Sequence, residues 1–126
     1  LIVCYDGIPS PGQASSSIVE TIDIFPTLCD IATIPSPDFA DGVSLAPILD
    51  DPMSAGHNAI SYHRNNARSI RSDSHRLIVH EDGYVELYDH NSPAKESKNL
   101  AKEQRQVAQE LLTTLNSRLA TIRSIP

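Results

Sequence analysis

A proline inside an apolar segment constrains the fold of this chain more than any other single residue. Residues 17–32 are rich in apolar side chains, and Pro26 would lie in their interior if they formed one helix. An interior proline removes a backbone hydrogen bond and clashes with the preceding turn, which costs roughly 3 kcal/mol. The segment therefore predicts a short strand followed by a helix that has Pro26 in its first turn, where a missing N–H loses no intrahelical partner.

The boundary between this strand and this helix is predicted at Asp23. Residues 18–22 alternate as a strand, and the Asp23 carboxylate can then accept a hydrogen bond from the Phe25 N–H. Its negative charge also faces the positive end of the helix dipole. Four side chains recur at spacings of three and four and predict one buried helix face: Phe25, Leu28, Cys29 and Ala32.

The rest of the first half predicts a second strand, loops and one short helix. Residues 1–5 are apolar and predict a buried strand, ended by a loop with two prolines and two glycines at residues 7–12. A polypeptide that begins inside a strand is interpreted as a piece of a longer protein. Residues 33–44 predict a loop, after which Ser44 caps a short helix with Pro47 in its first turn.

From residue 59 the apolar period changes to two, which indicates a sheet. Strands are predicted at residues 59–63, 67–72, 75–80 and 84–89, and Asp82-Gly83 is a strong hairpin signal. The predicted fold of this half is a four-stranded antiparallel meander with one buried face.

A long helix is predicted to start at Asn99 or a near neighbour. We expect it to pack on the sheet, although such a stripe would also suit a coiled-coil seam. The stripe consists of Val107, Ala108, Leu111, Leu112, Leu115, Leu119 and Ile122.

Charge and cysteine content exclude several classes of partner. The net charge of −6 argues against nucleic acid or an anionic membrane, because both need clustered Lys and Arg. No apolar run approaches the roughly 20 residues of a membrane span. Two cysteines are too few for a disulfide framework, and both Cys4 and Cys29 are predicted to be buried thiols.

No catalytic or metal-binding constellation is expected within this chain. His75 and His80 lie five apart on one predicted strand, so their side chains point to opposite faces and cannot share an ion. His57 and His90 are in loops without a Cys or His neighbour. There is also no nucleophile-elbow motif and no Gly-rich phosphate loop.

One stretch concentrates hydrogen-bond donors where a strand ends. Tyr62, His63 and Arg64 are therefore candidate substrate-binding residues, since Arg offers two-pronged hydrogen bonding to anionic sugars. Arg68 and Arg71 follow in the next strand. The alternative is that these two arginines pair with surface carboxylates and have only a structural role.

Four blocks of sequence occur in an order that is specific to one family. They are Val19–Ala32, Asp41–Leu49, Ala67–Arg71, and Glu86-Leu87-Tyr88-Asp89 followed by Asn99-Leu100-Ala101. Together they resemble the late part of the sulfatases, sulfate-ester hydrolases of the alkaline-phosphatase-like superfamily. The stretches 61–64 and 67–71 look most like the iduronate-2-sulfatase branch. The family pattern has a glycine where this chain has Thr33, so a left-handed helix cap is less expected here.

The resemblance implies an α/β enzyme, of which this piece is α+β. Residues 1–50 would be the last strands and helix of the large α/β domain, and residues 57–126 the small sheet with its long helix. Family members carry a formylglycine, made from Cys in a Cys-x-Pro-Ser-Arg motif, and a calcium or magnesium ion. Cys4 and Cys29 are followed by other residues, so the nucleophile and the metal ligands are expected upstream of Leu1.

The implied partners are the upstream large domain and a sulfated sugar, and the family suggests a periplasmic, secreted or lysosomal location. Self-association through exposed apolar surface is a further expectation. Two alternatives remain at this point. One is the same region of a phosphonate or phosphate ester hydrolase of the superfamily, and the other is a non-catalytic carbohydrate-binding or interaction domain.

Overall fold

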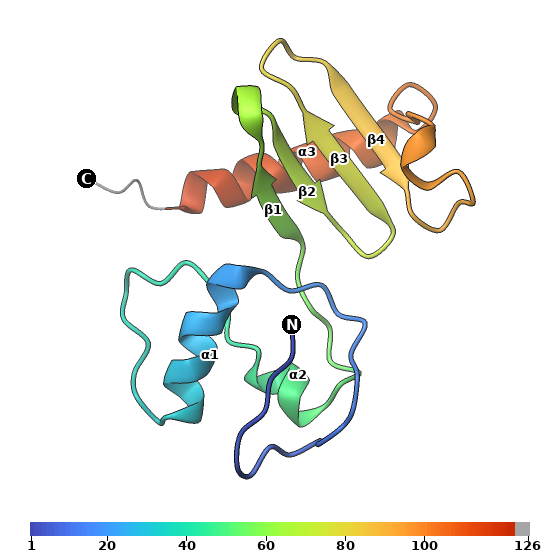
Figure 1. The fold of residues 1–126 in the computed structure, drawn as a ribbon. Helices are drawn as coiled ribbons and strands as arrows, with labels where there is room; N and C mark the ends of the chain where they lie inside the picture. The colour runs from blue at the N-terminus through green and yellow to red at the C-terminus, as the bar shows by residue number, and fades with distance from the viewer. Residues whose placement is uncertain (123–126) are drawn as a thin grey trace. The chain divides into compact units, whose positions relative to one another are not determined.

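The computed structural model describes residues 1–122, and the chain separates into two compact units. The first is Leu1–His57, and the second begins at Asn58. The first consists of loops and short helices, whereas the second holds a sheet and a long helix (Figure 1). The assignment of residues 1–50 and 57–126 to a large and a small sulfatase domain stays a prediction.

The second unit is built on an antiparallel meander with strand order β1-β2-β3-β4. Its strands are β1 (Ala59–Tyr62), β2 (Arg68–Arg71), β3 (His75–Val79) and β4 (Val85–Asp89). Gly83 closes the β3–β4 hairpin with a φ of 84°, which glycine adopts without steric cost. The predicted four-stranded sheet is confirmed, because the period of two followed its buried face.

One face of this sheet is covered by α3 (Arg105–Thr121), as Figure 1 shows. Leu77 on β3 is fully buried, and Leu115 on α3 is 1% exposed. Burying one such side chain contributes roughly 1.5–3 kcal/mol. The predicted packing of the helix on the sheet is confirmed, and its other contacts come from Val107, Ala108, Leu111, Leu112 and Leu119.

The predicted start of this helix at Asn99 or a near neighbour is wrong, since α3 begins at Arg105. The Asn99 side chain instead pairs with the free edge of β4. Its Oδ1 accepts the Leu87 N–H at 3.1 Å and its Nδ2 donates to the Val85 carbonyl at 3.1 Å. The Leu100 N–H adds a bond of 2.8 Å to the Leu87 carbonyl. Edge groups need partners, and this requirement outweighs helix formation at Asn99.

The first unit contains η1 (Thr21–Asp23), α1 (Ile24–Ile31) and α2 (Ala46–Asp50). The predicted strands at residues 1–5 and 18–22 are both wrong. A strand requires a neighbouring strand for its hydrogen bonds, and the described part of this unit supplies none. As a result Ile2 is 95% exposed, and Cys4 is exposed rather than buried.

The start of α1 differs from the prediction in its cap. The Asp23 carboxylate does not accept from Phe25. Its Oδ2 accepts the Glu20 N–H at 2.6 Å, and Glu20 and Asp23 form a reciprocal capping box around η1. Pro26 does lie in the first turn, as expected. At α2 the N-cap is Leu45 and not Ser44 as predicted, although the Ser44 hydroxyl does accept the Ala46 N–H at 3.2 Å from one position earlier.

The predicted buried face of α1 is largely wrong. Cys29 is buried, but Phe25 and Leu28 are 47% and 57% exposed, and Ala32 is exposed too. The helix buries Thr27 instead, because the Thr27 hydroxyl accepts the Leu45 N–H at 2.8 Å. The periodicity correctly identified the apolar side of α1. The side that is buried within the unit is instead the one that carries Thr27, which is hydrogen-bonded to Leu45.

The end of α1 is a left-handed cap despite the absence of glycine. Thr33 has a φ of 57°, and its N–H bonds the Asp30 carbonyl at 3.0 Å. The Ile34 N–H bonds the Cys29 carbonyl at 2.9 Å, which completes a Schellman motif. Thr33 therefore forms the left-handed cap that was less expected without a glycine at this position.

Candidate functional site

The sheet has a polar face opposite α3, which we call the outer face. Strand alternation and register place on it Ser69, Arg71, Arg76, Ile78, His80, Glu86 and Tyr88. His75 points the other way, where its Nε2 lies 3.0 Å from Gln104 Oε1 beside the start of α3. The prediction that His75 and His80 face opposite sides is therefore confirmed.

The candidate residues Tyr62, His63 and Arg64 lie together at the end of β1 but do not form one cluster. Tyr62 is 66% exposed, and Arg64 is exposed at the start of η2 (Arg64–Asn66). His63 Nε2 lies 2.9 Å from the buried Ser69 hydroxyl on the outer face. His63 continues the extended backbone, so alternation directs Tyr62 and His63 to opposite sides of the sheet.

The turn after these residues has a defined conformation. Asn65 and Asn66 both have left-handed backbones, with φ of 60° and 56°, and asparagine tolerates this region better than most residues. The Asn66 side chain donates to Glu81 Oε1 at 2.9 Å. Arg64 is thus held at a fixed corner with its side chain toward solvent.

The alternative role for Arg68 and Arg71 is not observed within residues 1–122. Neither arginine forms an ion pair with a described carboxylate. Arg71 Nη1 is buried and has no hydrogen-bond partner there. A buried donor without a partner is unusual and costs stability.

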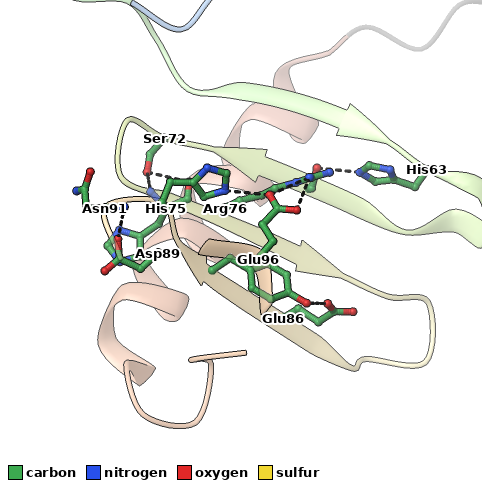
Figure 2. Close-up of polar contacts among 11 residues, drawn as sticks. His63, Ser72, His75, Arg76, Glu86, Asp89, Asn91 and Glu96 are labelled. Atoms are coloured by element: carbon green, nitrogen blue, oxygen red, sulfur yellow. Dashed lines mark hydrogen bonds and ion pairs between the residues drawn. The ribbon is translucent and has the colours of Figure 1, made fainter. Parts of the chain in front are cut away.

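Arg76 carries the main ion pair of the outer face instead. Its Nη1 lies 3.1 Å from Glu96 Oε1 (Figure 2). His90 Nε2 approaches the same oxygen at 2.9 Å. Burial alone would raise the pKa of Glu96, but the Arg76 hydrogen bond and charge, with His90, lower that pKa overall. Glu96 lies in η3 (Lys95–Ser97), so the pair ties this loop to β3.

A second polar group joins β3 to β4. The Tyr88 hydroxyl donates to Glu86 Oε2, and His80 Nε2 lies 2.6 Å from Glu86 Oε1. The Tyr88 hydrogen bond, with His80, lowers the pKa of Glu86 against the opposing effect of burial. The same hydrogen bond, with burial, raises the pKa of Tyr88 to about 12. Near neutral pH the tyrosine is therefore protonated and the carboxylate charged.

The first unit contains a His–carboxylate cluster that sequence reasoning missed. His57 Nε2 lies 2.8 Å from Oδ2 of the fully buried Asp23, and His57 Nδ1 lies 3.4 Å from Glu20 Oε2. Asp23 Oδ1 also accepts the Val43 N–H at 2.9 Å. The two groups are 34 residues apart, and no local spacing joins them.

These three residues are of types that hold metal ions, and their ligand atoms lie within 4.8 Å of one another. In this structure His57 Nε2 and Asp23 Oδ2 form a hydrogen bond of 2.8 Å. The hydrogen bonds of His57 therefore link the start of α1 to the end of the first unit.

The Asp41-Gly42 turn packs against the same region. A Cβ on Gly42 would lie 2.2 Å from the Ile22 carbonyl oxygen, a distance that no relaxed structure allows. Glycine is therefore required here by close backbone approach. Two of the four sequence blocks, 19–32 and 41–49, thus meet at Asp23 and Gly42.

A family comparison now decides what this chain is related to. The family described as N-sulphoglucosamine sulphohydrolase, C-terminal, matches residues 1–124. The chain belongs to this sulfatase family. Within residues 1–122, no helix has the length and apolar character that a membrane crossing requires.

Individual relatives agree with this sulfatase family. A Delta 4,5-hexuronate-2-O-sulfatase of Bacteroides thetaiotaomicron is 34% identical over 93 residues, which cover 66% of this chain and 19% of the relative. Human arylsulfatase K is 29% identical over 106 residues, covering 71% of this chain and 20% of the relative.

Solved sulfatases share the fold. One, in complex with its substrate D-glucosamine-2-N,6-O-disulfate, superposes with a TM-score of 0.70 at 25% identity, covering 87% of this chain and 26% of that one. A 2-O glycosaminoglycan sulfatase gives a TM-score of 0.64 at 28% identity, with 78% and 24% covered. The chain thus spans about a fifth to a quarter of the length of these relatives.

Proposed function

We propose that this chain is the C-terminal portion of a sulfuric ester hydrolase that acts on sulfated sugars, of the iduronate-2-sulfate type. The family match over residues 1–124 carries the proposal. The relatives support the choice of substrate, since one is a hexuronate-2-O-sulfatase and another was solved with a sulfated glucosamine. Arginine and histidine at the end of β1 suit an anionic sugar.

The formylglycine and the calcium or magnesium ion belong, in this proposal, to the upstream part of the enzyme. Cys29 is buried, and neither Cys29 nor Cys4 lies in a Cys-x-Pro-Ser-Arg motif, so neither fits the nucleophile. The His57 cluster offers one imidazole and two carboxylates, which are few of the oxygen ligands that calcium or magnesium prefers. In this enzyme class the two groups supply the nucleophile and offset negative charge on the sulfate.

The residues of this chain would then bind and orient the sugar. Arg64 is exposed at a fixed corner, and a guanidinium there can donate two hydrogen bonds to a uronate carboxylate. His63 is oriented by the Ser69 hydroxyl, and Tyr62 offers an exposed phenol beside it. Because Tyr62 and His63 point to opposite sides of β1, we assign the carboxylate contact to Arg64.

The upstream part of the same enzyme is the proposed partner of the first unit. Seven large apolar side chains of this unit, on α1 or close to it in sequence, are exposed, and exposed apolar surface often marks an interaction site. They are Ile22, Ile24, Phe25, Leu28, Ile34, Phe39 and Val43. The relatives are about four to five times longer than the matched segment, and this additional chain supplies a partner. Self-association through the same surface is the competing outcome.

Substitution of Arg64 in the full-length enzyme tests the substrate assignment. Arg64→Ala should lower kcat/KM on a sulfated uronic-acid substrate by about ten- to hundredfold, because a charge-assisted hydrogen bond is lost. A small aryl sulfate lacks the sugar carboxylate and should be turned over at nearly the normal rate.

Arg71→Ala is the control, because Arg71 lies within β2 and should act through stability alone. Equal losses on both substrates in Arg64→Ala would make Arg64 structural and contradict the assignment. Turnover of a phosphonate or phosphate monoester in place of every sulfate ester would favour the superfamily alternative. The absence of any hydrolysis would favour a non-catalytic carbohydrate-binding or interaction domain.

A further inference from the structure

A groove of about 510 Å³ lies beside the β3–β4 hairpin and the start of α3. Tyr84 and Val85 line it from the hairpin, and Asn99, Lys102 and Arg105 line it from the segment that leads into the helix. Ligand sites for small molecules commonly have volumes in the range of roughly 300–1,000 Å³. The groove is therefore large enough for one or two sugar rings.

The residues that line this groove include two cations and no acid, although the chain as a whole has a net charge of −6. Lys102 and Arg105 are both exposed, and neither forms an ion pair with any carboxylate of residues 1–122. The nearest acid along the chain, Glu103, is bound to Lys98 at 3.0 Å. Arg105 is the first residue of α3, and the first turn of this helix has no acidic residue to balance the positive dipole end.

The other residues that line the groove include an aromatic ring and an amide. Tyr84 is 54% exposed, and its ring lies 5.5 Å from the His80 ring, which supports it from the sheet. Asn99 Nδ2 donates to the Tyr84 hydroxyl at 3.2 Å and to the Val85 carbonyl at 3.1 Å. The phenol oxygen accepts that bond, so its own hydrogen is available to a ligand.

We propose that this groove binds an anionic sugar, sulfated or carboxylated, as a second site distinct from Arg64. Lys102 and Arg105 would contact the anionic group, and the Tyr84 ring would lie against the apolar face of the sugar. The two sites lie at opposite edges of the sheet, since Arg64 follows β1 and Val85 belongs to β4. Three strand spacings separate these edges, or roughly 14 Å. The choice of a sugar as ligand rests on the proposed function, whereas the choice of an anion rests on the groove.

The test is a titration of the 126-residue, isotope-labelled chain with a fully sulfated heparin disaccharide, followed by backbone amide signals. We expect saturable shifts at Tyr84, Asn99, Lys102 and Arg105. Lys102→Gln and Arg105→Gln should each weaken binding by about tenfold, as expected for a charge-assisted contact. An unsulfated disaccharide of the same linkage should bind at least about tenfold more weakly.

Lys95→Gln is the matched control, because Lys95 is also exposed, forms no ion pair within the described residues and changes the net charge equally. It should leave binding within about twofold, since distant surface charges are screened. An effect equal to that of Lys102→Gln would reveal unspecific charge attraction and overturn the site.

Two further outcomes separate this proposal from the proposed function. Loss of binding in Arg64→Ala, with binding intact in Lys102→Gln and Arg105→Gln, would place the sugar at β1 and overturn the groove alone. Equal affinity for inorganic sulfate and for the disaccharide would show that the groove holds an anion without recognising a sugar. The absence of shifts at all four residues would also overturn the proposal.

Discussion

At the scale of single residues, backbone conformation decides positions that composition leaves open. Gly42 is required because the Ile22 carbonyl lies where its Cβ would be, and Asp23 is buried because two backbone N–H groups and His57 surround its carboxylate. Thr33 is the exception, since a β-branched residue occupies a left-handed position that glycine suits better. The left-handed backbone of Thr33 gives a direct prediction.

Thr33→Gly should stabilise the first unit by about 0.5–1 kcal/mol. Glycine removes the steric cost of a φ of 57°, and part of this gain is offset by the larger entropy of the unfolded chain. Denaturant titration, followed through signals of residues 1–57, measures the change. Ala32→Gly should have the opposite sign, because Ala32 has a right-handed backbone with φ of −81°. Destabilisation by Thr33→Gly would contradict the assigned cap.

At the scale of elements, β4 is stabilised from three sides. Asn99 completes its free edge, α3 covers Leu87, and Tyr88 and Glu86 hydrogen-bond on the outer face. These contacts link the sheet to the segments that follow it in the sequence. Two predictions address the helix and the outer face separately.

The docking of α3 on the sheet should depend on its buried leucines. Leu115→Ala should lower the free energy of unfolding by roughly 2–5 kcal/mol, since the side chain is 1% exposed and its loss leaves a cavity. Gln109→Ala, on the exposed side of the helix, should change it by less than about 0.5 kcal/mol. Similar effects of both substitutions in denaturant melts would show that the helix is not docked as described.

The Tyr88–Glu86 pair should be visible in alkaline titration. Tyr88 has a pKa raised from 10.0 to about 12, so its contribution to stability is complete below pH 10 and is lost as the pH rises toward 12. Glu86→Gln removes the charge that the phenolate would face and should return the pKa of Tyr88 toward its ordinary value. Tyrosinate absorbance, with Tyr88→Phe identifying the signal, measures this. An unchanged late titration in Glu86→Gln would contradict the assigned cause.

At the scale of the whole molecule, the chain is one portion of a longer family pattern. The family match extends over residues 1–124, yet the chain spans only about a fifth to a quarter of its relatives. The apolar side chains exposed around α1 agree with a unit that another segment covers. Activity is therefore expected only when both portions are present.

The 126-residue chain alone should show no hydrolysis of a chromogenic aryl sulfate in the presence of calcium. No residue within it lies in the formylglycine motif, so the reaction has no nucleophile of this class. The assay compares the purified chain with a buffer blank and with the full-length enzyme. Turnover above the blank that survives further purification would refute the expectation.

The sequence by itself determined the sheet, the long helix and the family. In these elements periodicity and burial agree within one unit, so local patterns such as the period of two from residue 59 or the leucine stripe of α3 were sufficient. The ordered sequence blocks around Pro26, Gly42 and Asn99 identified the family. The role of Tyr62, His63 and Arg64 in substrate binding stays a prediction.

Only the tertiary structure decided the first unit and the polar contacts. Residues 1–5 and 18–22 have strand-like patterns, but strands form only where a neighbour accepts their hydrogen bonds. The His57–Asp23 contact joins groups 34 residues apart, and the groove joins Tyr84 to Arg105 across a turn and a loop. Such long-range contacts depend on how separate elements meet in space, and no spacing along the chain encodes them.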